Sequence, residues 1–308
     1  MTRILTADDV LQVLSIDDCI DAVERVFRDG GEAASLALGH FHAKTAIVGA
    51  RYAAKINANF PSNPERFGLP TIQGLIVLSD AERGTPLAVL DSIEITILRT
   101  AAASAVAAKH LARRDARTLA IVGCGAQARA HVEALRRVRP IERILAVDRD
   151  PSRAAMIGEV RDLDEAVREA DIVVTTTPST SPFLERRHLR PGLFIAAVGA
   201  DNPRKSELAP ELMAAAKVVV DIEEQAATMG DLHHALEAAA MTRHDLFGDL
   251  AAVVRGRGRT SDDEIFVFDS TGTALEDVAA AAIAYERALE RGIGMEVGFR
   301  SARTQSAL

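Results

Sequence analysis

The sequence predicts an α/β protein in which a doubly wound parallel sheet is joined to a second, α+β domain. Two patterns carry this prediction. Short apolar runs alternate with amphipathic helical stretches over residues 118–222, and strand-like runs separated by turn residues fill residues 51–92. A length of 308 residues agrees with two domains of about 150 residues each. With 48% hydrophobic and 26% charged residues, the composition excludes a disordered or fibrous chain.

Two short helices are expected at the start of the chain. Each is preceded by a capping box, Thr6 with Asp9 and Ser15 with Asp18, ahead of apolar residues at helical spacing. Gly30 is expected to end the second helix.

The region from 51 to 92 predicts an antiparallel meander, and a long Ala-rich helix follows over residues 95–112. Asp91 or Ser92 is the expected cap of this helix. Because its small residues permit close approach of another element, we interpret it as a connecting helix packed between domains.

From residue 118 the chain alternates strands and helices, which predicts a parallel sheet covered on both faces. The stretch 151–164 is short, so we expect one peripheral strand to be truncated. A last amphipathic helix over 277–292 is expected to leave this domain and pack on the N-terminal one. The predicted strands lie at 118–123, 143–148, 171–177, 193–199 and 217–222.

Charge and hydropathy exclude several classes of protein. The net charge is −8, with no block of basic residues, which argues against nucleic acid as a partner. No apolar run reaches about 18 residues, so no membrane span is expected, and the polar N-terminus favours a cytoplasmic protein. Cys19 and Cys124 cannot form a disulfide framework, and no Cys/His spacing indicates a metal site.

The string GCGAQA at residues 123–128 follows an apolar strand and precedes a helix, as a dinucleotide-binding fingerprint requires. Gly123 permits the tight turn, Gly125 lets the backbone approach a pyrophosphate, and Ala128 allows close packing of strand and helix. Asp148 ends the next strand, 148 − 123 = 25 positions later, where a carboxylate accepts hydrogen bonds from ribose hydroxyls. The alternative is a small-residue turn without a ligand.

These residues predict NAD(H) as the cofactor. Arg149 and Arg153 could neutralise the 2′-phosphate of NADP(H), but Asp148 would repel it, so NADP(H) is the less favoured choice. Cys124 is interpreted as a small packing residue. We place the nucleotide domain of the Rossmann type at 116–272 and a second, substrate-binding domain at 1–115 with 273–308.

The run RYAAKINANF at 51–60 places Lys55 on one strand face with Ala53, Asn57 and Asn59, and an apolar set on the other face. With Thr71 at the start of the next strand and Arg99 in the Ala-rich helix, Lys55 suggests an anion site suited to a carboxylate. The alternatives are that Lys55 is a solvated charge and that Arg99 pairs with Glu94 or Asp91.

Asp201 follows the strand at 193–199, at the sheet edge where such folds collect ligands. Its carboxylate could orient or deprotonate an amine. An Asx turn before Pro203 is the alternative. The histidines have no spacing that forces a role, and His42 is the best spare acid or base.

Five motifs, in order, resemble the ornithine cyclodeaminase/mu-crystallin family, which includes archaeal-type alanine dehydrogenases and ketimine reductases. They are KINANFPSNPERFGLPTIQG, LAVLDSIEITILRTAAASAVAA, GCGAQA, VGADNPRKSEL and FDSTGTALED. The resemblance implies that Lys55, Thr71 and Arg99 hold the substrate carboxylate and that Asp201 is the acidic catalytic residue, with Lys55 also placed in catalysis. It further implies a homodimer, with the domain at 1–115 and 273–308 serving also in dimerisation. The cofactor-binding residues expected are Thr100, Gly123, Gly125, Ala126, Gln127, Asp148, Arg149 and Gly199.

The resemblance implies an NAD(H)-dependent oxidoreductase that transfers hydride at the α-carbon of a small amino acid or a cyclic imino acid. The alternatives are a cyclodeaminase that recycles NAD and a non-catalytic binding protein of the mu-crystallin kind. Cyclodeaminases carry a further carboxylate-binding Arg upstream, which this sequence lacks. Arg51, Lys44 or a histidine could replace it.

Overall fold

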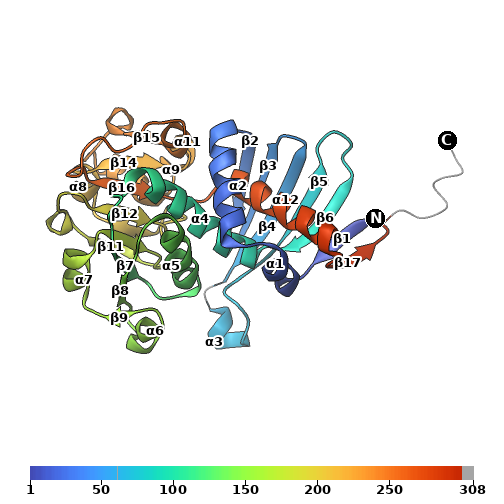
Figure 1. Ribbon diagram of the computed structural model, residues 1–308, viewed down its shortest axis with the longest axis horizontal. Helices are drawn as coiled ribbons and strands as arrows, with labels where there is room; N and C mark the ends of the chain where they lie inside the picture. The colour runs from blue at the N-terminus through green and yellow to red at the C-terminus, as the bar shows by residue number, and fades with distance from the viewer. Residues whose placement is uncertain (61, 300–308) are drawn as a thin grey trace, which may run out of the picture. The chain divides into compact units, whose positions relative to one another are not determined.

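The computed structural model describes residues 1–60 and 62–299 (Figure 1). The chain divides into two compact units: Met1–Arg99 with the segment that begins at Thr273, and Thr100–Gly272. The division falls inside helix α4 (Ile93–Leu111), whereas the sequence-based boundary lies after that helix, at 115/116. The roles assigned to the two domains stay predictions. Asp91 caps α4, because its Oδ1 accepts the backbone N–H groups of Ile93 at 2.8 Å and Glu94 at 3.1 Å.

The first unit is built on a seven-stranded sheet of order β17-β1-β6-β5-β4-β3-β2. Strands β4 to β6 form the predicted meander. Four strands that were not predicted, β2, β3, β1 and β17, extend it, and β1 is parallel to β6. The two terminal strands β1 and β17 escaped prediction because each is short and pairs across the whole chain length. The strands are β1 (Thr2–Leu5), β2 (Glu32–Leu38), β3 (Phe41–Val48), β4 (Arg51–Asn59), β5 (Ile72–Asp80), β6 (Pro86–Asp91) and β17 (Met295–Val297).

Helices α1 (Ala7–Val13) and α12 (Ala274–Arg291) pack on this sheet, α2 (Ile16–Asp29) packs on α12, and α3 (Asn63–Phe67) lies in the loop before β5. Both predicted capping boxes are present at α1 and α2, and α2 ends at Gly30, whose φ of 82° suits glycine. Helix α12 lies along α2 and across β3 and β4 (Figure 1). The expectation that the last helix joins the N-terminal unit is confirmed.

The two faces of β4 differ as the alternation predicts, but the covered face is the one that carries Lys55. Lys55 is 4% exposed and Ala53 2%, whereas Ile56 on the opposite face is 58% exposed. Ile56 stands in one row with Leu36 of β2 and Leu75 of β5, each more than half exposed. The outer face of this sheet is therefore apolar and exposed.

The second unit contains an all-parallel sheet of order β15-β14-β16-β12-β10-β7-β8-β9. Chain order reverses between β7 and β10, which creates the switch point where doubly wound folds bind ligands. The predicted α/β fold class, with a Rossmann-type unit and an α+β unit, is confirmed. The strands are β7 (Thr118–Val122), β8 (Arg143–Val147), β9 (Glu159–Val160), β10 (Ile172–Thr175), β12 (Phe194–Ala197), β14 (Lys217–Val220), β15 (Gly248–Asp249) and β16 (Phe266–Asp269).

The central strands β10 and β12 are fully buried, with every residue of Ile172–Thr175 and Phe194–Ala197 buried, as expected of a parallel sheet covered by helices. As expected, the stretch after Pro151 is truncated: β9 has two residues. A small separate pair is formed by β11 (Thr180–Leu184) and β13 (Ser206–Leu208). The helices are α5 (Ala126–Val138), α6 (Pro151–Ala155), α7 (Leu163–Glu169), α8 (Pro210–Met213), α9 (Glu223–Ala226), α10 (Gly230–Glu237) and α11 (Leu250–Val254), with 3₁₀ turns η1 (Arg186–His188) and η2 (Arg243–Asp245).

Within residues 1–60 and 62–299, no helix combines the length and the apolar character that crossing a bilayer requires.

Candidate functional site

The turn at Gly123 requires glycine for two reasons. Its φ is 95°, and a Cβ there would lie 2.9 Å from the carbonyl oxygen of Thr176. The Gly123 N–H donates to the carbonyl of Val147 at 2.9 Å, and the Thr176 hydroxyl donates to the Gly123 carbonyl at 2.7 Å. These contacts fix the turn between β7 and α5 against the ends of two neighbouring strands.

Gly125 differs from Gly123, because a Cβ at Gly125 would meet no protein atom within 4 Å. It is the N-cap of α5 and makes no side-chain capping bond, and Ala126 and Gln127 form the first helical turn. The protein's own packing therefore does not demand glycine at 125. A group that approaches the positive N-terminus of α5 closely would demand it, as a dinucleotide pyrophosphate does.

Asp148 follows β8 and holds the glycine loop. Its Oδ2 accepts the Cys124 N–H at 2.7 Å, and its Oδ1 accepts the Asp150 N–H at 2.9 Å. Burial, followed by the charge of Asp148, raises the pKa of Cys124 to about 11, so the thiol stays protonated at neutral pH. This supports the interpretation of Cys124 as a packing residue.

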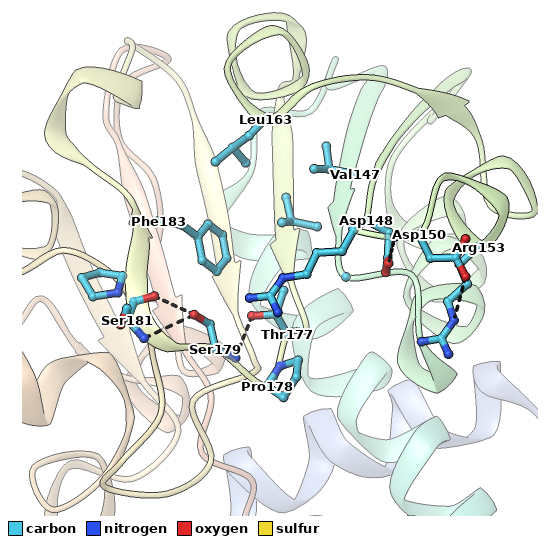
Figure 2. A pocket seen from close by; sticks show the side chains of 14 residues that line it. Val147, Asp148, Asp150, Arg153, Leu163, Thr177, Pro178, Ser179, Ser181 and Phe183 are labelled. Carbon is cyan, nitrogen blue, oxygen red and sulfur yellow. Dashed lines mark hydrogen bonds and ion pairs between the residues drawn. The ribbon is translucent and has the colours of Figure 1, made fainter. Parts of the chain in front are cut away.

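A cavity of about 690 Å³ opens beside this loop, within the second unit (Figure 2). Apolar side chains of Leu163, Val147 and Phe183 gather at one end, and Thr177 lies nearer the other. Arg149 and Arg153 line the cavity together with Asp148, and Arg153 pairs with Asp150 at 3.6 Å. An apolar slot beside a carboxylate at the switch point fits the adenine and ribose of a dinucleotide.

Thr100 and Gly199 belong to the same unit. Thr100 is buried in α4. Gly199 follows β12, where its N–H donates to Glu207 Oε2 at 2.8 Å, and a Cβ would lie 2.3 Å from the Thr177 carbonyl oxygen. Packing alone therefore requires glycine at 199.

Glu207 is a fully buried carboxylate that sequence analysis did not identify. It accepts four hydrogen bonds: from the Thr177 N–H and hydroxyl, from the Thr175 hydroxyl and from the Gly199 N–H, at 2.6–2.8 Å. Burial raises its pKa to about 7 against these donors. Glu207 ties the end of β10 to the loop after β12, and the Thr177 loop lines the cavity.

A second cluster lies in the first unit, where Lys55 and Arg99 meet one carboxylate. Lys55 Nζ and Arg99 Nε both donate to Asp277 Oδ1 at 2.9 Å, and Arg99 Nη1 donates to Glu276 Oε2 at 2.7 Å. Lys55 Nζ also donates to the Thr96 hydroxyl at 2.6 Å. The structure thus brings the two predicted cations together, and Arg99 pairs with neither Glu94 nor Asp91.

Burial lowers the pKa of Lys55 to about 8, with Asp277 opposing the shift and Arg99 adding to it. Asp277 has a lowered pKa because the attraction of Lys55 and Arg99 outweighs its burial. The cluster therefore combines a permanent guanidinium cation with an amine that can lose its proton near neutral pH.

Glu276 and Asp277 were not predicted as site residues, although both stand in the FDSTGTALED motif. Glu276 completes the capping box of Thr273 through Oε1, which leaves Oε2 for Arg99. Acidic residues in a first helical turn complement the helix dipole, and that local role concealed their contacts with residues 177 and 222 positions away.

The remaining predicted residues make contacts of their own. Arg51 pairs with Glu286 at 3.3 Å. Thr71 precedes β5, and its carbonyl accepts the Phe60 N–H at 2.8 Å. Asp201 lies in the second unit, where its Oδ1 pairs with Lys205 Nζ at 2.7 Å and its side chain is 46% exposed.

Folding also gathers His233, His234 and Glu237 on α10, with ligand atoms close enough to share a metal ion. His233 Nε2 lies 3.5 Å from Glu237 Oε2, and His234 Nε2 lies 2.9 Å from the Lys205 carbonyl oxygen. No metal-binding role was predicted for this group, because its spacing matches no familiar zinc motif.

A family model described as the ornithine cyclodeaminase/mu-crystallin family matches residues 1–292. The chain belongs to the ornithine cyclodeaminase/mu-crystallin family. The resemblance carried by the five motifs is thereby confirmed. Two solved structures that are similar to this chain contain NAD or NADH.

Three similar proteins illustrate the range of the ornithine cyclodeaminase/mu-crystallin family. Alanine dehydrogenase from Archaeoglobus fulgidus is 37% identical over 97% of this chain and 98% of its own. An archaeal alanine dehydrogenase dimer with bound NAD has a TM-score of 0.92, with 36% identity over 97% of this chain and 99% of that one. Δ1-Pyrroline-2-carboxylate reductase from Thermococcus litoralis, in complex with NADH and L-proline, has a TM-score of 0.90, with 29% identity over 96% and 100% of the two chains.

Proposed function

We propose that this protein is an NAD(H)-dependent oxidoreductase that acts at the α-carbon of a small amino acid or a cyclic imino acid. The observation that carries the proposal is that Lys55 and Arg99, both buried, donate hydrogen bonds to the same oxygen, Asp277 Oδ1. The chain also has a complete dinucleotide loop at Gly123 and Asp148. Similar proteins act on alanine, a small α-amino acid, and on Δ1-pyrroline-2-carboxylate, a cyclic imino acid. Both compounds carry a carboxylate on the α-carbon.

The chain's own residues divide the work between binding and orientation. Lys55 and Arg99 hold the substrate carboxylate, which fixes the α-carbon in one orientation. Gly125, Ala126 and Gln127 hold the pyrophosphate, and Asp148 holds the ribose. When bound, NAD(H) accepts or supplies the hydride. Asp201 orients the substrate nitrogen or takes its proton.

A third cation lies beside Lys55. Lys44 of β3 is directly opposite Lys55 of β4 in the strand register, and its charge contributes to the lowered pKa of Lys55. Because Lys44 faces Lys55 across the strand pair, we propose that Lys44 takes the place of the family's upstream Arg.

Cyclodeamination is the second candidate function, favoured by the half-exposed carboxylate of Asp201, which could seat a distal amine. In that reaction the α-amine is oxidised to an imine, the side-chain amine closes the ring, ammonia leaves, and the hydride returns to carbon. Both reactions share the first step, so Lys55 and Arg99 serve both.

The experiment that separates them incubates the protein with NAD and alanine, ornithine, lysine or arginine, and follows NADH and ammonia together. Ammonia matched by NADH indicates a dehydrogenase, whereas ammonia without net NADH indicates cyclodeamination. NADH oxidation with Δ1-pyrroline-2-carboxylate indicates an imine reductase. If neither NADH nor ammonia changes in any assay, the protein is interpreted as a non-catalytic binding protein.

Lys55→Ala tests the carboxylate site. We expect the variant to raise KM or to abolish turnover, because one cation of the site is lost, while NADH binding measured by fluorescence stays at the wild-type level. Wild-type kinetics in Lys55→Ala would contradict the assignment of Lys55.

We also propose that two copies of the chain associate through the outer face of the seven-stranded sheet. Leu36, Ile56 and Leu75 form an apolar row on that face, each more than half exposed, and a similar alanine dehydrogenase is a dimer. Ile56→Lys is expected to give a monomer in light scattering, and an unchanged mass would exclude this face.

The cytoplasm is the compartment we propose. Both cysteines, Cys19 and Cys124, are buried free thiols, as is usual in reducing compartments.

A further inference from the structure

Asp277 joins the two cations of the proposed carboxylate site through a single oxygen. Lys55 Nζ and Arg99 Nε both donate to Oδ1 at 2.9 Å, and the side chains of all three residues are at most 7% exposed. Within the described part of the chain, Oδ2 of Asp277 is buried and has no hydrogen-bond partner. The bridge therefore depends on one atom.

We propose that Asp277 is a positioning residue, which fixes Lys55 and Arg99 relative to each other and keeps Lys55 protonated for binding of the substrate carboxylate. The inference rests on the proposed function. It adds a residue of α12 that was not among the predicted site residues and that need not touch the substrate.

The position of Asp277 in α12 favours a negatively charged side chain. It lies in the first turn of α12, four residues after the N-cap Thr273, where the helix dipole favours negative charge. The same turn directs Glu276 to Arg99 Nη1 at 2.7 Å. Arg99 is thus held by two carboxylates, whereas Lys55 has Asp277 as its single anionic hydrogen-bond partner among the described residues.

The charged groups around Lys55 come from three elements. Asp277 and Glu276 approach from α12, Arg99 from α4, and Lys44 from the neighbouring strand β3. Two of these neighbours are cations that favour the neutral amine, and burial favours it as well. Asp277 is the hydrogen-bonded charge that opposes them. Without it, Lys55 would lose its proton at a lower pH.

Asp277→Asn is the sharpest test, because the asparagine amide can occupy the same space. Its carbonyl can accept at the position of Oδ1, and its NH₂ falls at the position of Oδ2, where no described donor points. The variant removes the charge and keeps the shape. Glu290→Gln is the matched control, since it removes one carboxylate from the exposed end of the same helix.

The first readout is the pH dependence of kcat/KM for the substrate identified in the screen above. We expect the alkaline limb of Asp277→Asn to move to lower pH by about one unit or more, with KM rising before kcat falls. Glu290→Gln should leave the limb in place. A uniform loss of activity without movement of the limb would show a merely structural role and overturn the proposal.

The second readout needs no substrate. Only a neutral amine reacts with acetic anhydride, so the pH dependence of Lys55 acetylation, followed by mass spectrometry, reports its proton directly. Lys109, Lys205 and Lys217, which lie outside the cluster, are internal references. Half-maximal labelling of Lys55 should fall at lower pH in Asp277→Asn than in the wild type, and equal profiles would overturn the proposal even if no substrate is found.

Asp277→Glu covers the case in which Asp277→Asn does not fold. It keeps the negative charge on a longer side chain, so we expect the wild-type position of the alkaline limb and of the Lys55 labelling profile even where activity falls. A shift in Asp277→Glu would contradict the role of charge. If no substrate is found, or if Lys55→Ala keeps full activity, the proposed function or the proposed carboxylate site fails, whereas the labelling result still decides whether Asp277 keeps Lys55 protonated.

Discussion

The two units bury charge in opposite ways. In the first unit, Lys55 and Arg99 are paired with Asp277 and Glu276, so the buried cluster contains both signs. In the second unit, buried carboxyl groups accept hydrogen bonds from backbone N–H groups and hydroxyls, with no buried cation at their oxygens among the described residues. These carboxyl groups belong to Glu207, Asp221, Asp231 and Asp269.

The difference appears in the direction of the pKa shifts. Lys55 and Arg99 hold the pKa of Asp277 below its usual value, whereas burial raises the pKa of Glu207, Asp221, Asp231 and Asp269. Neutral donors thus organise the strand ends of the second unit without keeping every carboxyl ionised. Opposite charges in the first unit favour the ionised forms of the groups that they pair.

The largest expected effect comes from removing a carboxylate of the second unit. Glu207→Ala leaves the N–H groups of Thr177 and Gly199 without their acceptor, so we expect the free energy of unfolding to fall by about 3 kcal/mol or more. NADH binding should weaken as well, because Thr177 lines the cavity. Urea unfolding and NADH fluorescence titration measure these effects, and a loss below about 1 kcal/mol would show that Glu207 does not organise the strand ends.

An intermediate effect is the pH dependence of stability, which should have opposite origins in the two units. The stabilising contribution of Glu207 is complete below its ordinary pKa of 4.5 and is lost as pH rises through about 7. That of Lys55 is present above 10.5 and is lost as pH falls through about 8. At 1.36 kcal/mol per pKa unit, each spans at most about 3 kcal/mol.

Urea unfolding between pH 5 and 10 tests both contributions in one series. Glu207→Gln should reduce the decline in unfolding free energy between pH 5 and 7, whatever its absolute stability. Lys55→Met should reduce the rise between pH 8 and 10. Slopes identical to the wild type in both variants would show that neither group titrates in these windows.

The smallest expected effect concerns an ion pair nearer the surface of the first unit. Glu286→Gln breaks the contact with Arg51, and we expect the unfolding free energy to change by less than about 1 kcal/mol, since both groups contact water. The same variant releases Arg51. An unchanged KM would agree with Lys44 as the third cation, whereas a marked fall in KM would indicate that Arg51 reaches the substrate.

Much of the fold is local in origin and could therefore be predicted. The capping boxes at Thr6 and Ser15, the stop at Gly30 and the short peripheral strand β9 all depend on residues within a few positions of each other. Strands β1 and β17 are different, because their pairing joins the two ends of the described chain. No local pattern marks such a strand.

The site divides in the same manner. The glycine loop and Asp148 lie within one βαβ segment, so their spacing could be recognised from sequence. The partner of Lys55 is Asp277, 222 positions away, and its position beside a helix cap indicates a local role first. No sequence pattern marked Glu207 as a buried carboxylate. Its four hydrogen-bond donors belong to residues 8 to 32 positions away, and these residue types are common in loops.

The truncated strand β9 has a consequence for the protein in a crowded solution. The edge of a parallel sheet exposes unpaired N–H and C=O groups, which can recruit a strand from another molecule. Here the edge is two residues long, and Glu159 is engaged by Arg143 and Arg161, each at 2.9 Å. An incoming strand would find little backbone to pair with and would have to displace these charges, so the shortened segment guards the nucleotide-binding sheet against aggregation.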